Sequence, residues 1–102
     1  MLRTEGSIDQ LKHALEVSQA RHAMLGRNLA NLHTAGYQRA DLDFEAALND
    51  VERGVQAHRA DGGSPDLVRE ASELAANDAF YVACARLLSL RYQTIRQSLK
   101  ER

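Results

Sequence analysis

The sequence predicts an all-α fold in which two long terminal helices form an antiparallel hairpin or coiled coil, with a short middle helix and flexible loops. Three observations support this prediction. Alanine and leucine supply much of the apolar content, and only 5% of the residues are aromatic. Apolar residues recur at alternating three- and four-residue spacing towards both ends of the chain. No glycine or proline follows Pro65, so a helix can continue from there.

Size and charge limit the classes of protein that the chain can belong to. Its 102 residues are enough for one domain and too few for two, so we treat 1–102 as a single helical domain. The net charge is -1, and basic residues are interleaved with acidic ones, which gives no argument for nucleic-acid binding. No stretch is long and apolar enough for insertion into a membrane.

The first long helix is expected at about residues 8–32. Ser7 is a good N-cap, and Gln10 completes a capping-box pattern. Two polar residues, Ser18 and His22, interrupt the apolar seam; they either mark the register or lie where the partner surface is wet, and the wet alternative is favoured. The seam that we expect consists of Ile8, Leu11, Leu15, Ser18, His22, Leu25, Leu29 and Leu32.

The middle of the chain predicts a turn and a short helix at about residues 34–58. Gly36 supplies a position that can take φ > 0, as a helix C-cap or tight turn requires. Extended chain or loop should follow, and Asp41 or Asp43 can cap the short helix. Its apolar face would carry Phe44, Leu48, Val51 and Val55. Residues 58–64 form a linker by composition, with two adjacent glycines.

The second long helix is expected at about residues 65–100. Ser64 can serve as the N-cap, with Pro65 at the first helical position and an acid after it. Glu70 and Glu73 fit a solvated charged face of this helix. The expected seam consists of Leu67, Ala71, Leu74, Asp78, Tyr81, Ala85, Leu88, Tyr92, Ile95 and Leu99. Phe80, Cys84 and Leu87 form a second apolar row, and one partner helix cannot cover both rows.

Two separated motifs resemble one known family. Asn28-Leu-Ala30-Asn31, followed by Thr34-Ala-Gly36-Tyr37, resembles the N-terminal signature of flagellar rod, hook and hook-associated proteins. The segment 41–48 narrows this resemblance to the flagellar basal-body rod protein B family, and the stretches 61–77 and 81–99 are similar to the C-terminal part of that family. The family usually has proline where this chain has Ala35, so the turn loses a preset φ and should be less rigid.

The resemblance implies a structural subunit that self-assembles through its terminal helices into the tubular proximal rod of the flagellum, as motility requires. Its partners would be further copies of itself, other rod subunits, the basal-body ring or adaptor proteins, and the export apparatus. Its place would be the rod in the periplasmic space, reached without a cleaved signal peptide. Asn28 and Asn31 either end a helix or bond a neighbouring subunit through their amides, and the resemblance favours the second alternative.

No pattern in the sequence indicates catalysis, a cofactor or a metal. Cys84 lies in a helical pattern, where a small buried hydrophobic residue is expected rather than a reactive thiol. The four histidines lack a nearby acid that would complete a compact ligand set. We therefore expect no enzyme. The alternative to a rod subunit is a small helical adaptor or chaperone that binds a partner helix in an exposed groove.

Overall fold

The computed structural model describes residues 2–50, 58–60 and 63–101 of the chain. Its elements follow in the order α1 (Leu2–Ala30), β1 (Ala40–Leu42), α2 (Phe44–Asn49), β2 (His58–Ala60) and α3 (Leu67–Lys100). The two long helices contain 29 and 34 residues, and the two strands contain three residues each. The all-α fold with two long terminal helices is therefore confirmed.

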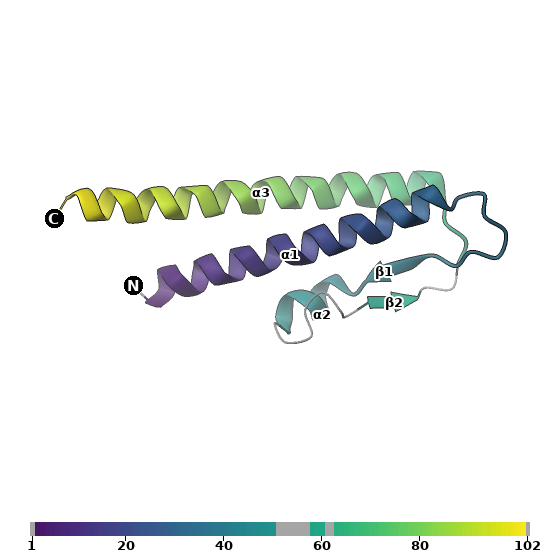
Figure 1. Ribbon diagram of the computed structural model, residues 1–102, viewed down its shortest axis with the longest axis horizontal. Helices are drawn as coiled ribbons and strands as arrows, with labels where there is room; N and C mark the ends of the chain where they lie inside the picture. Colours follow the sequence, from purple (N-terminus) through teal and green to yellow (C-terminus); the bar gives the residue numbers. More distant parts are fainter. Residues whose placement is uncertain (1, 51–57, 61–62, 102) are drawn as a thin grey trace.

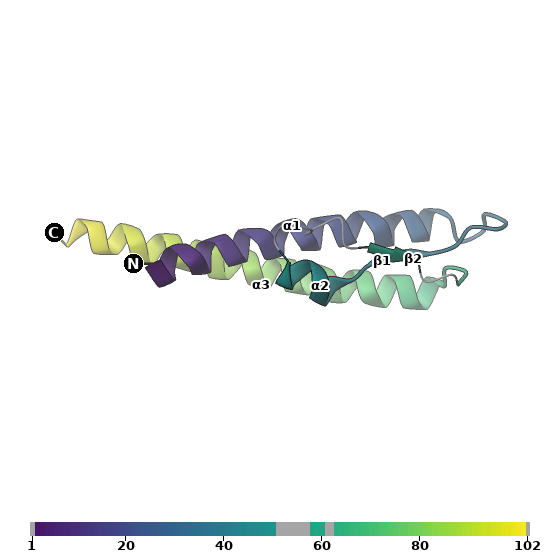
Figure 2. The same ribbon diagram turned by 90° about the horizontal axis from the view of Figure 1, so that it is seen from below.

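The long helices run antiparallel, side by side, and α3 extends past the N-terminal end of α1 (Figure 1). The chain is elongated, with dimensions of 63 × 24 × 14 Å, and both termini lie at the same end. β1, β2 and α2 lie along α1 near the other end, where they thicken the hairpin (Figures 1 and 2). The helical hairpin is thus covered by other elements over only part of its length.

Helix α1 begins earlier than the sequence predicts. Ser7 lies inside the helix, so its expected role as N-cap is wrong. The physical reason is that one glycine, Gly6, costs a helix only about 1 kcal/mol relative to alanine, too little to stop it. The other end agrees better with the prediction, because α1 ends at Ala30 and Gly36 takes a φ of 76° in the turn that follows.

Helix α3 begins later than predicted, because Asp66 and not Ser64 is its N-cap. An Asp66 carboxylate oxygen accepts a hydrogen bond from the Arg69 backbone nitrogen at 2.9 Å. Pro65 therefore lies just before the cap instead of at the first helical position. A carboxylate at this position also interacts favourably with the positive end of the helix dipole, which a serine hydroxyl cannot match.

The middle of the chain contains a small antiparallel sheet that the sequence does not indicate. β1 pairs with β2 in the register Ala40↔Ala60 and Leu42↔His58, where loop and linker were expected. The prediction of a linker over 58–64 is therefore wrong for 58–60. Asp43 caps α2 as expected, by accepting a hydrogen bond from Ala46 nitrogen, whereas the predicted positions of Val51 and Val55 lie outside the described residues.

The main apolar cluster joins the middle segment to α1. Phe44 also reaches α3, where its ring meets that of Phe80 edge to face at a centroid distance of 5.0 Å. The cluster consists of buried Val17, Leu42 and Ala47, with Ala20, Met24, Phe44 and Leu48 packed against them. This cluster is small, and much of the contact between the two long helices lies outside it.

The predicted helix seams are only partly buried. Leu25 is fully buried, whereas Tyr92 is 45% exposed and does not belong to the packed seam. The half-buried seam residues are Leu11, Leu15, Leu29, Leu32, Leu74, Tyr81, Ala85, Leu88 and Ile95. Among the residues whose burial the structure describes, 7–50 and 63–101, the large apolar side chains that remain exposed all lie on α3; they are Leu67, Val68, Val82, Leu87, Leu90, Tyr92 and Leu99. A single partner helix covers only one side of α3, which explains why these side chains remain in solvent.

Replacing Leu25 by alanine should lower the free energy of unfolding by about 2–5 kcal/mol, because the substitution leaves a cavity at a buried position. The matched variant Leu90→Ala removes the same atoms from a position that is 56% exposed and should change stability by about 1 kcal/mol or less. Urea unfolding followed by far-UV circular dichroism at low protein concentration measures both. Equal losses for the two variants would contradict this packing.

Candidate functional site

Asn28, in the motif that carries the family resemblance, is a fully buried contact point between three segments of the chain. Its Nδ2 donates hydrogen bonds to the Ala40 carbonyl at 2.7 Å and to Glu70 Oε1 at 3.0 Å. Its Oδ1 accepts hydrogen bonds from Ala40 nitrogen and from the Tyr37 hydroxyl, both at 3.1 Å. One amide therefore fastens β1 and the preceding loop to the end of α1 and to α3.

Arg39 and Glu70 form an ion pair beside Asn28, and neither side chain is exposed to solvent. The guanidinium donates two hydrogen bonds to the carboxylate, from Nε to Oε2 and from Nη2 to Oε1, each 2.9 Å long. The Arg39 backbone nitrogen also donates to the Gly63 carbonyl at 2.8 Å. We call the set of Asn28, Tyr37, Arg39 and Glu70 the turn clamp.

A second ion pair extends the turn clamp along the helices. Arg21 in α1 donates two hydrogen bonds to Asp41, at 3.0 and 3.1 Å, and lies over the Phe44 ring at 5.6 Å from its centroid. Glu73 in α3 accepts a hydrogen bond from Arg39 at 3.1 Å and lies 3.6 Å from Arg21. Among the described residues, no buried side-chain nitrogen or oxygen lacks a hydrogen-bond partner. The charges are therefore mutually satisfied, as burial requires.

The ion pairs shift the acidity of the carboxyl groups. Burial alone raises the pKa of Glu70, but hydrogen bonds from Arg39 and Asn28 outweigh it and leave the pKa below its ordinary value of 4.5. Burial likewise raises the pKa of Asp41, and the hydrogen bonds and charge of Arg21 bring it below 3.8. Both groups are therefore anionic at neutral pH, with a charge-dependent contribution to stability.

The rest of the resemblance motif forms the turn after α1. Asn31 donates through Nδ2 to the Arg27 carbonyl at 2.8 Å, and its Oδ1 accepts a hydrogen bond from the Thr34 hydroxyl at 3.0 Å. Gly36 is the one described residue with a positive φ. Ala30 ends the helix and is exposed. Asn31 and Thr34 therefore act as local turn residues, as the helix-ending alternative expects.

Two interpretations of polar residues need correction. Asn28 uses its amide inside the chain, so the interpretation in which it bonds a neighbouring subunit is wrong. Glu70 was expected on a solvated face and is instead fully buried against Arg39.

The seam predicted for α3 is one residue out of phase near its start. Continuing the row of Phe80 and Cys84 towards the N-terminus by helical spacing reaches Asn77, Glu73 and Glu70, a signal that could have found them.

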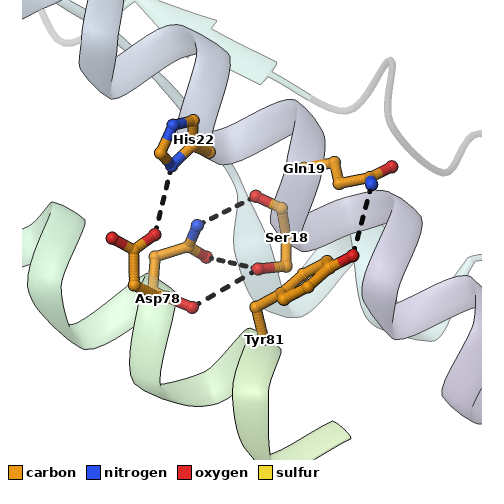
Figure 3. A pocket seen from close by; sticks show the side chains of 6 residues that line it. Ser18, Gln19, His22, Asp78 and Tyr81 are labelled. Carbon is orange, nitrogen blue, oxygen red and sulfur yellow. Dashed lines mark hydrogen bonds and ion pairs between the residues drawn. The ribbon is translucent and has the colours of Figure 1, made fainter. Parts of the chain in front are cut away.

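A second polar contact joins the middles of the long helices. The Ser18 hydroxyl donates to Asn77 Oδ1 at 3.1 Å, and Asn77 Nδ2 donates to the Ser18 carbonyl at 2.9 Å (Figure 3). Both side chains are buried. Ser18 therefore fixes the register of α1 against α3, contrary to the favoured wet interpretation. That interpretation is correct for the neighbouring His22, which is exposed and lies 3.1 Å from an Asp78 oxygen.

These residues line a groove of about 290 Å³ between α1 and α3, together with Gln19 and Tyr81 (Figure 3). The groove contains a serine, a histidine and an aspartate, the residue types of a hydrolase triad. The geometry differs from a triad, however, because the Ser18 hydroxyl is directed to Asn77 and is buried, while His22 and Asp78 lie on the exposed side. The groove is thus a seam contact with a solvated edge.

Other chemistry finds no support among the described residues. Over residues 2–50, 58–60 and 63–101, no three histidine, cysteine or acidic side chains come together as metal ligands. In the same part of the chain, neither long helix has a segment apolar enough to span a bilayer. Cys84 is buried as expected, and burial raises the pKa of its thiol.

Replacing Arg39 by methionine should lower the free energy of unfolding by about 3–5 kcal/mol, because Glu70 is left buried without its partner. The matched variant Arg69→Met breaks the half-exposed pair with Glu73 and should cost about 1 kcal/mol or less. The double variant Arg39→Met/Glu70→Met should be more stable than Arg39→Met alone. Urea unfolding checks all three, and equal effects at Arg39 and Arg69 would contradict the turn clamp.

Acid should destabilise the protein through the same carboxyl groups. Since the folded pKa values of Glu70 and Asp41 lie below the ordinary 4.5 and 3.8, their stabilisation is complete above those values and is lost as pH falls through the folded ones. The free energy of unfolding should therefore decrease as the pH falls below about 5. The variant Glu70→Gln should lose less over this range than the unaltered chain, and an identical pH profile would exclude Glu70 as a contributor.

No known family model matches this chain, and no curated protein matches it either. The resemblance to the rod family therefore stays an expectation, which rests on the sequence stretches 28–37, 41–48, 61–77 and 81–99 alone. The structure adds that the first motif contributes Asn28 and Tyr37 to the turn clamp and forms the turn beside it.

Proposed function

We propose that this chain is a self-assembling structural subunit of the kind that forms the flagellar basal-body rod. One observation carries the proposal: an elongated two-helix hairpin leaves seven large apolar side chains exposed on α3, at 45–72% of their surface. Scattered exposed apolar residues are ordinary, but seven on one 34-residue helix indicate a surface that other chains cover. The C-terminal stretches that resemble the rod family, 61–77 and 81–99, lie largely on this helix.

The energetic argument concerns what a single copy lacks. Fully burying one leucine contributes about 1.5–3 kcal/mol, and a single copy leaves several such side chains in solvent. Assembly of further copies along α3 would bury them. Heterologous contacts between copies of one chain produce rings or open helical arrays, and a tubular rod is an array of that kind.

The turn clamp gives the proposed subunit a fixed frame for assembly. It joins the end of α1, the start of α3 and β1 through buried hydrogen bonds. The hairpin can therefore meet its neighbours as one rigid unit at this end. In this proposal the motif serves assembly by fixing the subunit's own shape, and the apolar surface of α3 makes the contacts between copies.

The proposal places the subunit in the rod within the periplasmic space, after export without a cleaved signal peptide. Its neighbours would be further copies, other rod subunits and the basal-body ring or adaptor proteins. No catalytic role is included, and neither nucleic acid nor a membrane is among the proposed partners. The export apparatus would be a transient partner.

Replacing Leu90 by glutamate should weaken self-assembly, because it puts a charge in a surface that assembly buries. The matched variant Gln38→Glu adds the same charge at an exposed position of the loop after α1 that is already polar and lies outside α3. Sedimentation velocity over a concentration series should show large species for the unaltered chain and for Gln38→Glu, and fewer for Leu90→Glu. Where the encoding organism swims by flagella, only Leu90→Glu should abolish swimming.

A chain that stays monomeric at every concentration would contradict the proposal. The alternative is a helical adaptor, which the groove between α1 and α3 favours because its edge at His22 and Asp78 is open to solvent. An adaptor would bind one partner helix at fixed stoichiometry and would lose that partner when the groove residue Tyr81 is replaced by glutamate. Pull-down from the source organism, followed by measurement of stoichiometry, separates the two functions.

A further inference from the structure

Charge is segregated along the chain in a way that the small net charge conceals. Residues 1–78 contain thirteen acidic and eight basic residues, hence a charge of -5. Residues 79–102 contain one acidic and five basic residues, hence +4. The interleaving of the two signs that the sequence indicated therefore holds only for the first part. The last part includes the end of α3 that projects beyond α1, so positive charge is concentrated towards that end of the molecule (Figure 1).

The positive part combines basic and apolar side chains on one side of α3. Arg86, Leu90, Arg96 and Lys100 are all exposed, and their spacing places them within one sector of the helix. We call these four residues the basic row. Cys84, which is buried, lies on the other side of α3, so the basic row faces away from α1. This row has the mixed character of a contact surface, with an apolar centre between cations.

The negative part has a corresponding surface at α1 and α2. Asp9, Glu16 and Glu45 are exposed, and Asp9 and Glu16 share one face of α1 with His13. The Nε2 atom of His13 lies 2.7 Å from the Ala47 carbonyl, which brings α2 against that face. We call Asp9, Glu16 and Glu45 the acidic flank.

A groove marks the place where the acidic flank could receive a side chain. It has a volume of about 320 Å³ and lies between α1 and α2. Its lining consists of Asp9, Gln10, His13, Leu48 and Asn49. The groove thus offers one carboxylate, two side-chain amides, an imidazole and the apolar side chain of Leu48. A leucine flanked by arginines fits this combination of charge and polarity.

We propose that the basic row of one copy docks on the acidic flank of a second copy. This inference rests on the proposed self-assembly and names the surfaces that make it. The two surfaces have opposite charge and belong to the same chain, so a second copy supplies the complement without any other partner. Since the two surfaces differ, the contact is heterologous, and successive copies add in one direction.

The test uses two charge-reversed variants of the full chain, Arg86→Glu/Arg96→Glu and Asp9→Lys/Glu45→Lys. Each alone should raise the concentration needed for assembly about tenfold or more, because like charges then face each other. An equimolar mixture should assemble at nearly the concentration of the unaltered chain, because each variant carries the complement of the other. Assembly of the unaltered chain should also weaken with salt, since the screening length falls from about 10 Å at 0.1 M to about 3 Å at 1 M.

Net charge is controlled by Arg27→Glu/Arg91→Glu, which changes it as much as Arg86→Glu/Arg96→Glu does, at exposed positions outside the basic row and the acidic flank. It should assemble like the unaltered chain, and circular dichroism should give equal helicity for all variants. If the control loses assembly equally, or if Arg86→Glu/Arg96→Glu assembles normally, this inference is overturned while the proposed function stands. If the unaltered chain never assembles, both fail.

An anionic membrane is the competing occupant of the basic row, and vesicles of phosphatidylserine and phosphatidylcholine test it. Loss of vesicle binding in Arg86→Glu/Arg96→Glu with unchanged self-assembly would assign the row to lipid and overturn the inference. Vesicle binding that is absent, or that is the same in this variant and in the unaltered chain, supports docking between copies. Flotation with the vesicles and sedimentation velocity provide the two readouts.

Discussion

A guanidinium and a carboxylate without solvent contact impose a strict constraint, because each must find all its hydrogen-bond partners inside the protein. Arg39 and Glu70 meet this requirement only when the loop after α1, the start of α3 and Asn28 come together. The pair adds little stability relative to apolar residues of the same size. Its effect is on specificity, because other arrangements of the hairpin would leave these charges buried without partners.

The polar interior of the hairpin and its apolar exterior are related. Positions of α3 that face α1 are occupied by Glu70, Asn77 and Cys84, and not by a continuous row of leucines. Ser18 opposite Asn77 continues the same pattern on α1. Leucines and valines consequently occur on other sides of α3, where a single copy cannot bury them. The interior selects one pairing of the helices, and the exterior retains the hydrophobic surface for contacts between molecules.

Helical periodicity made the two long helices predictable, and Asp43 was recognisable as a cap because its chemistry is local. The pairing of β1 with β2 could not be predicted, since three-residue strands separated by a helix leave no periodic signal in the sequence. The Arg39–Glu70 pair was also hidden, because its members are 31 residues apart and each resembles an ordinary surface charge. Motif resemblance singled out Asn28 but not its role, which depends on Glu70 and the Ala40 backbone.

The position of the turn clamp at one extremity of the hairpin has a mechanical consequence. Near the chain ends, α1 and α3 are held together mainly by half-buried aliphatic side chains such as Leu11 and Leu88, with the Ser18–Asn77 contact midway. Local unfolding follows the least costly route. We therefore expect α1 and α3 to separate first near the chain termini and to remain joined at the turn clamp until its ion pair breaks.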